Sequence, residues 1–539
     1  MAIDYGYNGR QATSNVTFNQ IGLYLQDEWN IRDNFKLTAG VRFDDLLFNE
    51  DDIITNNAIR DIDFGGRHID TGKWPNSNIQ ISPRVGFTWD VFGDKSLKVR
   101  GGTGLFAGRL PLVFFTNMPA ASAMIQNRPV FSTTYNSDGT VKSRDAGLDK
   151  FVGGLVTDVE QIRQLMGESV APANITPEQG LFQKSIAGVD PEFKMPQVWK
   201  SSIAVDYQLP VNFPFTATAE FTYTKKINDV RLVNWNVKED TSGWERLKGA
   251  DNRLLYPSDF KYNDKVSDAC MLVNTSRGYG WTANLTLNAE PIENLNIMAA
   301  YTHTVMKEVS GMPGSNATSA WNGLYTIDGP NLGKVQNSQY VIPDRIIANI
   351  SYKYGKEHFS LFYTGYSPAG YSFFYNGDVN GDGIATDLMY IPANDSEIKF
   401  TDESDRQLFW DFVNQDSYLK NHKGEYAEAY SARAPFVHRF DFRWAHDFDL
   451  KIGNTMHKLQ LSADFMNIGN LFSSRWGVEK DMVGSFSGQF LKVDKVENGV
   501  PYFSMRKDSE GNAPTQTWSY NHAYDQCWKL QIGVKYYFN

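Results

Sequence analysis

The last fifteen residues alternate strictly between apolar and polar side chains. The segment from Asp525 reads DQCWKLQIGVKYYFN, and one parity holds Trp528, Leu530, Ile532, Val534, Tyr536 and Phe538. A period of two residues is typical of a strand with one apolar and one polar face. A strand of about ten residues that ends in aromatic side chains fits an outer-membrane β-barrel, whose strands face lipid on one side and the lumen on the other.

The same alternation recurs along the chain in pairs of segments that are separated by short turns. The pairs are residues 21–31 with 35–43, 79–89 with 97–99, 203–209 with 215–223, 279–287 with 295–301, 346–352 with 359–363, and 436–448 with 459–465. Each pair predicts an antiparallel hairpin. The sequence therefore predicts an all-β fold, a transmembrane antiparallel β-barrel to which this chain contributes about thirteen strands.

The connections between these segments alternate in length. Within a pair they have about two to five residues, and between pairs they are much longer. The longest are predicted at residues 109–196 and 370–432. Short periplasmic turns and long extracellular loops are the topology of barrels in the outer membrane of Gram-negative bacteria. Within the first long loop, Val159, Ile162, Leu165 and Met166 fall at helical spacing and predict one short helix.

Composition narrows the class of protein further. The mean hydropathy is −0.42, and no apolar run approaches the roughly 20 residues that a membrane helix needs. The net charge is −10 without a cluster of Lys or Arg, which argues against nucleic-acid binding. Cys270 and Cys527 make no disulfide framework, and whether they pair is left open. The first residues have no signal peptide, so we expect the chain to be part of a longer exported protein.

The terminal strand and the number of strands together predict how the barrel closes. Thirteen strands is an odd number, whereas bacterial single-chain barrels have even numbers. Unpaired backbone groups in hydrocarbon cost several kcal/mol each, so an open edge there is unfavourable. We therefore expect the row from Trp528 to Phe538 to pair with the first strand of the complete barrel, upstream of Met1.

Several segments resemble the Oar-like TonB-dependent outer-membrane receptors of Bacteroidetes and their relatives. They are LYLQDEWNIRDNFKLTAGVRFD from Leu23, ISPRVGFTWDVFGDKSLKVRGGTGLFAGRLP from Ile81, DPEFKMPQVWKSSIAVDYQLP from Asp190, DVNGDGIATDLMYIP from Asp378, ADFMNIGNLFSSRWG from Ala463 and the terminal strand. The resemblance implies a plugged barrel of about 22 strands, in which this chain supplies about strands 10 to 22 without the plug. It also implies transport driven by the TonB complex, and a terminal strand read by the outer-membrane assembly machinery.

One loop has the spacing of a cation site. Asp378, Asn380, Asp382 and Gly383 fit D-x-[DN]-x-[DN]-G, in which oxygen ligands at alternate positions converge on Ca²⁺. Position 12 is Met389 instead of glutamate, so Asp387 at position 10 would complete the ligand set. The alternative is a plain Asn/Asp/Gly turn at the tip of an extracellular loop.

Three further features allow two interpretations each. The acidic loop 49–72 either binds a cation or is simply solvated, and we favour solvation. The apolar run from Leu110 to Phe115 either contacts substrate or plug at the barrel mouth, or packs against the wall, and we favour packing. The polar positions of the strands predict a hydrophilic lumen lined by Gln20, Glu28, Lys36, Arg42, Lys98, Arg100 and Glu220.

These observations predict the barrel wall and ligand-binding loops of a TonB-dependent importer of an unidentified nutrient. Its expected partners are outer-membrane lipid, the TonB complex, the assembly machinery and an extracellular ligand. The alternatives are an unplugged porin or secretion channel, and a surface adhesin or structural protein. The sequence shows no nucleophile elbow or Walker loop, so we do not expect an enzyme.

Overall fold

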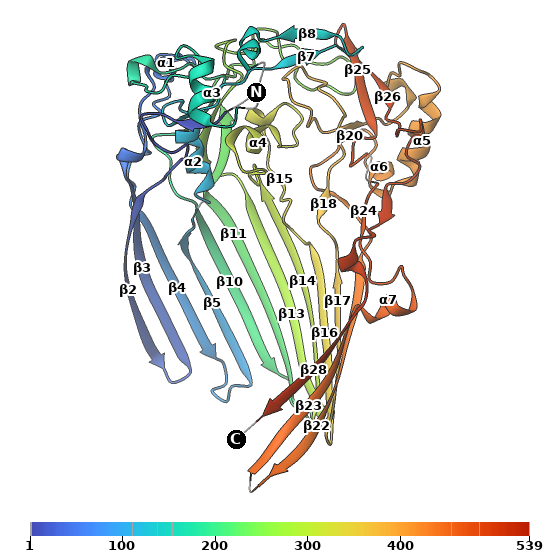
Figure 1. Cartoon of the computed structure of the whole chain (residues 1–539). Helices are drawn as coiled ribbons and strands as arrows, with labels where there is room; N and C mark the ends of the chain where they lie inside the picture. The colour runs from blue at the N-terminus through green and yellow to red at the C-terminus, as the bar shows by residue number, and fades with distance from the viewer. Residues whose placement is uncertain are drawn as a thin grey trace.

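Thirteen strands form one continuous antiparallel wall (Figure 1), and each pairs with its neighbours in chain order. The computed structural model describes residues 3–109, 111–136, 138–151, 156–453, 455–483 and 486–537. The wall strands are β2 (Phe18–Arg32), β3 (Phe35–Phe48), β4 (Gln80–Asp90), β5 (Leu97–Ala107), β10 (Gln197–Gln208), β11 (Phe215–Asn234), β13 (Tyr279–Ile292), β14 (Leu295–Glu308), β16 (Asp344–Tyr354), β17 (Glu357–Tyr366), β22 (Val437–Ile452), β23 (Thr455–Met466) and β28 (Lys529–Tyr537). The predicted all-β fold and its hairpins are confirmed.

The short turns lie at one end of the wall and the long connections at the other (Figure 1). The turn between β13 and β14 consists of Glu293 and Asn294, and Asn294 adopts a left-handed φ of 64°. Asparagine tolerates this conformation better than most residues, which favours it in a tight hairpin. The long connections cover residues 49–79, 108–196, 235–278, 309–343, 367–436 and 467–528, and we call them together the loop assembly.

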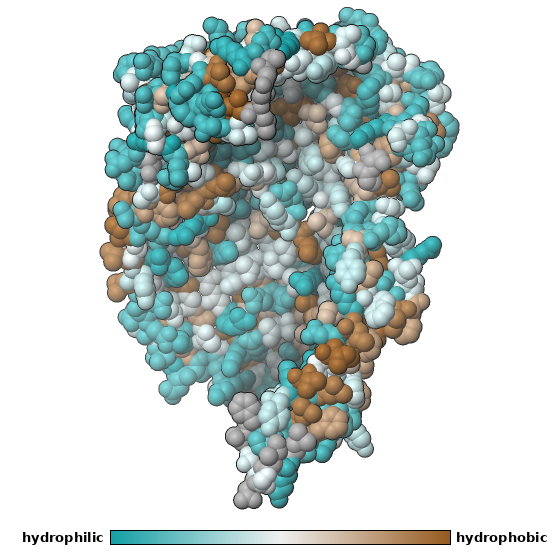
Figure 2. Space-filling view, in the orientation of Figure 1, coloured by the Kyte–Doolittle hydropathy of each residue, from teal (hydrophilic) through white to brown (hydrophobic). Residues whose placement is uncertain are grey.

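The apolar positions of the wall face outward and stay exposed. Leu25 on β2 is 74% exposed and Val534 on β28 is 65% exposed. Figure 2 shows hydrophobic side chains along β2 at the left margin and along β28 at the lower right. Trp528, Leu530, Ile532 and Tyr536 belong to the same exposed row, whereas Phe538 lies outside the described residues. A face of this kind is stable in lipid and unfavourable in water.

The opposite face of the wall is polar, and ion pairs connect side chains of neighbouring strands on it. Lys36 Nζ lies 2.6 Å from Glu28 Oε1 across the β2–β3 hairpin. Arg100 on β5 lies 3.2 Å from both Asp206 and Glu220 on the next two strands. These side chains include several that the sequence predicted to line the lumen.

The loop assembly contains most of the buried apolar side chains. Its strands are β6 (Gln126–Asn127), β7 (Thr133–Tyr135), β8 (Val141–Arg144), β9 (Ser185–Val189), β12 (Asp268–Thr275), β15 (Gln336–Asn337), β18 (Gly370–Tyr371), β19 (Tyr390–Ile391), β20 (Glu425–Tyr426), β21 (Ala432–Arg433), β24 (Lys480–Met482), β25 (Leu491–Glu497), β26 (Val500–Met505) and β27 (Trp518–Tyr520). A further strand, β1 (Tyr5–Gly6), precedes the wall and pairs with β6. The helices of the loop assembly are α1 (Asn57–Arg60), α2 (Val113–Ala120), α3 (Val159–Met166), α4 (Ala317–Asn322), α5 (Asp405–Gln415), α6 (Ser417–Asn421) and α7 (Ile468–Phe472). Four clusters of buried hydrophobic residues hold these elements together, so the loops are folded.

Two sequence predictions about the first long connection can be compared with the structure. The predicted helix is confirmed as α3, which Asp158 caps by accepting a hydrogen bond from the Gln161 backbone N–H. The apolar run lies partly in α2, where Phe115 is fully buried against Phe48 of the wall and Trp74. Packing is therefore confirmed for Phe114 and Phe115, whereas Val113 is exposed and Leu110 lies outside the described residues.

Two further observations concern the whole described chain. Cys270 is buried, Cys527 is exposed, and both are free thiols. Among the described residues, the helices are too short or too polar to cross a membrane.

Arginine at position 532 should destabilise the fold, whereas arginine at the adjacent position 531 should be tolerated. Ile532 lies on the apolar face of β28, and Gln531 lies on the polar face opposite Asp464. An arginine on the lipid face costs about 2–4 kcal/mol near the bilayer midplane. Urea unfolding of Ile532→Arg and Gln531→Arg in phospholipid vesicles measures the difference. Equal destabilisation by the two substitutions would contradict the assignment of the faces.

Candidate functional site

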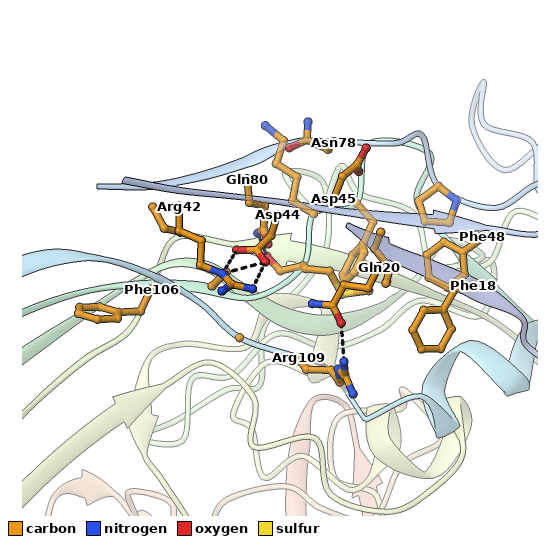
Figure 3. A pocket seen from close by; sticks show the side chains of 18 of the residues that line it. Phe18, Gln20, Arg42, Asp44, Asp45, Phe48, Asn78, Gln80, Phe106 and Arg109 are labelled. Carbon is orange, nitrogen blue, oxygen red and sulfur yellow. Dashed lines mark hydrogen bonds and ion pairs between the residues drawn. The ribbon is translucent and has the colours of Figure 1, made fainter. Parts of the chain in front are cut away.

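A pocket of about 350 Å³ lies where the loop ends of β2 to β5 meet the loop assembly (Figure 3). Its lining combines wall residues with residues of two long connections, 49–79 and 108–196. The wall contributes Phe18, Gln20, Arg42, Asp44, Asp45, Leu46, Phe48, Gln80, Ser82, Arg84, Phe106 and Ala107, and the connections contribute Pro75, Asn76, Asn78, Gly108, Arg109, Leu112, Phe193, Lys194 and Met195. The pocket therefore lies on the polar face of the wall, beneath folded loops.

The ion pair of Arg42 and Asp44 forms one side of the pocket. The two residues are two positions apart on β3, so their side chains share a face of the strand. Arg42 Nε donates to both Asp44 carboxylate oxygens, at 3.0 and 2.8 Å, and Nη2 donates to Oδ1 at 2.7 Å. A multidentate pair of this kind fixes the orientation of both side chains. On β2, Gln20 accepts a hydrogen bond from Arg109 of the adjoining connection.

Aromatic rings form the apolar part of the lining. Phe48 stacks on Trp74 with ring centroids 5.0 Å apart, which attaches the end of β3 to the buried core of the loop assembly. The Arg84 guanidinium lies 5.2 Å from the ring centroid of Phe106. Rings and hydrogen-bond donors thus face the same space, which suits a polar solute that carries rings or other apolar faces.

The charges in the lining favour an acidic solute. Four basic side chains (Arg42, Arg84, Arg109 and Lys194) line the pocket with two carboxylates (Asp44 and Asp45). The surplus is positive although the whole chain carries −10. The guanidinium of Arg42 is already paired with the carboxylate of Asp44. Lys194 and Arg109 are exposed residues of a long connection, from which their side chains can reach a ligand.

The sequence predicts some of the polar residues of this pocket but none of its aromatic residues. Of the residues predicted to line the lumen, Gln20 and Arg42 line the pocket, and the others lie outside its lining. Phe18, Phe48 and Phe106 were missed, although all three occupy the polar parity of their strands. That break in the alternation, confined to the loop ends of β2, β3 and β5, is the signal that could have found them.

The predicted calcium loop folds as a series of tight turns around its own carboxylates. Asp378 Oδ1 accepts from the backbone N–H of Asn380 at 3.1 Å and of Gly381 at 2.7 Å, and Oδ2 accepts from that of Gly383 at 2.7 Å. Asp382 Oδ1 accepts from the Ile384 N–H at 2.8 Å. These bonds are those of the Asn/Asp/Gly turn that the sequence offered as the alternative.

Asp387 has a cationic partner that the sequence did not predict. It is 2% exposed, and its Oδ1 lies 3.4 Å from Arg253 Nη1. Arg253 is fully buried and also donates from Nε to Asp251 at 2.9 Å and from Nη2 to the Leu388 carbonyl at 2.6 Å. A guanidinium from the 235–278 connection therefore already balances part of the negative charge of this loop.

The carboxylates of Asp378, Asp382 and Asp387 lie close enough in this loop to repel one another. Burial, together with repulsion from Asp387 and Asp378, raises the pKa of Asp382 to about 8. Burial raises the pKa of Asp387 to about 7, against the attraction of Arg253. Among the residues that the structure describes, no group of three or more His, Cys, Asp or Glu side chains is arranged to hold a metal ion. Calcium binding by Asp378, Asn380, Asp382 and Asp387 therefore stays a prediction.

The raised pKa values predict a pH dependence. Asp382 and Asp387 have a higher pKa in the folded loop than in an unfolded chain, so folding favours their protonated forms. Their contribution to stability is present below the unfolded value of about 4 and is lost as the pH rises through the folded values near 7 and 8. Without divalent cations, the 367–436 connection should resist proteolysis better at about pH 5 than at about pH 9.

Two comparisons make this test specific. Asp382→Asn should flatten the pH dependence, because it removes the carboxylate with the most strongly raised pKa. Calcium should restore protease resistance at high pH in the unmutated protein but not in Asp382→Asn. Resistance that is independent of pH would show that the repulsion is unimportant, and restoration absent at every calcium concentration would show that the loop is a turn only.

Comparisons with known proteins were made for both sequence and structure. The family described as "Outer membrane beta barrel domain" matches residues 3–474. Similar solved structures include the outer membrane transporter YddB from Escherichia coli (TM-score 0.45, 12% identity, 96% of this chain and 45% of that chain). The siderophore receptor PiuA from Acinetobacter baumannii (0.39, 9%, 97% and 43%) and the ferric citrate transporter FecA (0.36, 12%, 97% and 45%) are also similar. The chain spans less than half the length of these structures, and no curated protein matched the sequence.

Proposed function

The chain belongs to the outer membrane beta barrel domain family and is a protein of the outer membrane, and from this premise we propose that it forms the wall and the ligand-binding end of a TonB-dependent importer. The Oar-like subtype is part of this proposal and rests on the segments from Leu23, Ile81, Asp190, Asp378 and Ala463. The TonB complex would act through a part of the transporter outside this chain.

The position of the pocket is the observation that carries the proposal. It lies at the boundary between the loop assembly and the polar face of the wall. A solute captured by the loops would therefore already contact the surface that leads toward the short-turn end. Further along the wall, its polar face carries charged side chains such as Arg100, which pairs with Asp206 and Glu220.

The folded state of the loops favours capture over free diffusion. A porin needs an open path, whereas this end of the wall carries several buried cores, one of which contains Phe48 and Phe115 beside the pocket. An adhesin would present its binding residues on the outer surface of the loops, but the pocket residues lie mostly on the wall. The proposal includes no catalytic step.

The nutrient itself is proposed only as a chemical class. The positive surplus and the aromatic rings favour an acidic solute of moderate size that also has apolar faces. A carboxylate or phosphate group would be bound by Arg109 and Lys194, and its apolar part would pack on Phe106 or Phe18.

Pocket variants should reduce uptake, whereas a matched arginine elsewhere on the wall should not matter. Arg109→Ala with Lys194→Ala removes the two cations proposed to bind the acidic group, and Arg443→Ala removes one that pairs with Asp464 far along the wall. The solute is first identified with a strain that lacks the gene. This strain is grown on single nutrients, and the solute is the nutrient that it no longer takes up. The pocket variant should restore its uptake about tenfold less well than the unmutated gene, the effect of losing ~1.4 kcal/mol of binding.

The same assay separates the alternatives. Uptake that survives a protonophore would indicate a porin, and solute or cell binding without uptake would indicate an adhesin. Full activity of the pocket variant, or an equal loss in Arg443→Ala, would contradict the placement of the site.

A further inference from the structure

The segment from Asn467 to Trp476 carries three exposed large apolar side chains outside the strands of the wall. Phe472 is 75% exposed, Trp476 is 60% exposed and Leu471 is 45% exposed. Phe472 is thus more exposed than Ile532, which faces lipid at 61%. Three large apolar side chains on one short segment form a patch that water solvates poorly.

The segment is held rigidly at its two ends. The Asn467 N–H donates to Asp441 Oδ1 at 2.7 Å, and Asn467 Nδ2 donates to the carbonyls of Gly477 at 3.2 Å and Gln526 at 2.9 Å. Gly477 has a φ of 67°, and a Cβ there would lie 1.9 Å from Asn467 Oδ1. The polar groups of Asn467 are therefore turned inward, and these bonds fix the position from which the apolar side chains project.

The depth of the segment follows from its contact with Trp528. The backbone N–H of Trp528 donates to Asn470 Oδ1 at 3.2 Å. Trp528 is the aromatic residue at the loop end of the exposed apolar row of β28, and Tyr536 lies near the other end. Outer-membrane strands carry aromatic residues where hydrocarbon meets the headgroups. The segment therefore lies at the depth of the outer membrane–water interface.

The direction of the segment is away from the polar face. In Figure 1, α7 projects beyond β17 and β22 at the right margin, below the rest of the loop assembly. The segment thus lies beside β22 and the start of β28, where Asn467 is hydrogen-bonded to Asp441 and Asn470 to Trp528. Arg475 adds a cation, with its guanidinium 5.8 Å from the ring centroid of Tyr520.

We propose that the segment Asn467–Trp476 is an interfacial anchor that inserts Leu471, Phe472 and Trp476 into the outer leaflet of the membrane. The occupant of the patch is lipid, because the segment lies beside the start of β28 and at the depth of the aromatic end of its lipid-facing row. Apolar side chains at the acyl boundary with a nearby cation at headgroup level are typical of interfacial segments. The anchor holds the strands that follow and precede it at a fixed height in the membrane.

Spin labels can test this in the full-length protein, purified from membranes and reconstituted in vesicles of phosphatidylethanolamine and phosphatidylglycerol. With Cys527 replaced by serine, labels are attached at Phe472→Cys, at Ile532→Cys as the lipid control and at Lys142→Cys as the aqueous control. Collision with oxygen reports lipid, and collision with a water-soluble nickel chelate reports water. The label at 472 should collide with oxygen more than with nickel, at a depth shallower than the label at 532.

Glycine variants test the built geometry. Gly477→Ala should displace the segment and move the label at 472 toward water, because the new Cβ meets Asn467. Gly511→Ala is the matched control, since Gly511 also has a positive φ but nothing within 4 Å of an added Cβ. A label at 472 that behaves like the one at 142 would overturn the proposal. A label shielded from both reagents would also overturn it, because a protein partner would then cover the patch.

Discussion

Backbone hydrogen bonding in a medium without water is the constraint on which this structure depends. Each N–H and C=O in hydrocarbon must find a partner within the protein, and antiparallel strands in a continuous ladder satisfy that demand. The eleven wall strands from β3 to β23 pair in this way on both sides. Among the described strands, β2 pairs with β3 alone and β28 pairs with β23 alone, so barrel closure through Trp528 to Phe538 stays a prediction.

The same constraint explains why the apolar residues lie in two separate places. On the wall they face outward and remain exposed, as Leu25 and Val534 do. In the cores of the loop assembly they turn inward around residues such as Phe115 and Phe409. The pocket forms where these two arrangements meet, and there aromatic rings and wall charges face the same space.

Much of the wall could be predicted from the sequence because its signal is local. A period of two residues assigns each side chain to one face of its strand. It therefore predicts Glu28 and Lys36 on the same polar face, and the structure shows them as an ion pair. The pocket could not be predicted in the same way. Arg109 and Lys194 belong to a long connection, and its path in space leaves no periodic pattern in the sequence.

The predicted calcium loop shows most clearly what a single sequence does not reveal. Its motif suggested a bound cation, and the partner that lies beside Asp387 is Arg253, which is 134 positions earlier in the chain. A buried ion pair between distant segments leaves no pattern in a single sequence. By contrast, the Phe residues on the polar parity of β2, β3 and β5 were visible in the sequence, and they show that breaks in an alternation carry information.

Labelling of single cysteines in intact cells tests the central claim, that the loop assembly faces the exterior and the short turns face the periplasm. With Cys527 replaced by serine, Lys142→Cys places a thiol on β8 of the loop assembly, and Glu293→Cys places one in the turn between β13 and β14. A membrane-impermeant maleimide should label position 142 in intact cells and position 293 only after the outer membrane is permeabilised. Labelling of 293 but not 142 in intact cells would contradict the account.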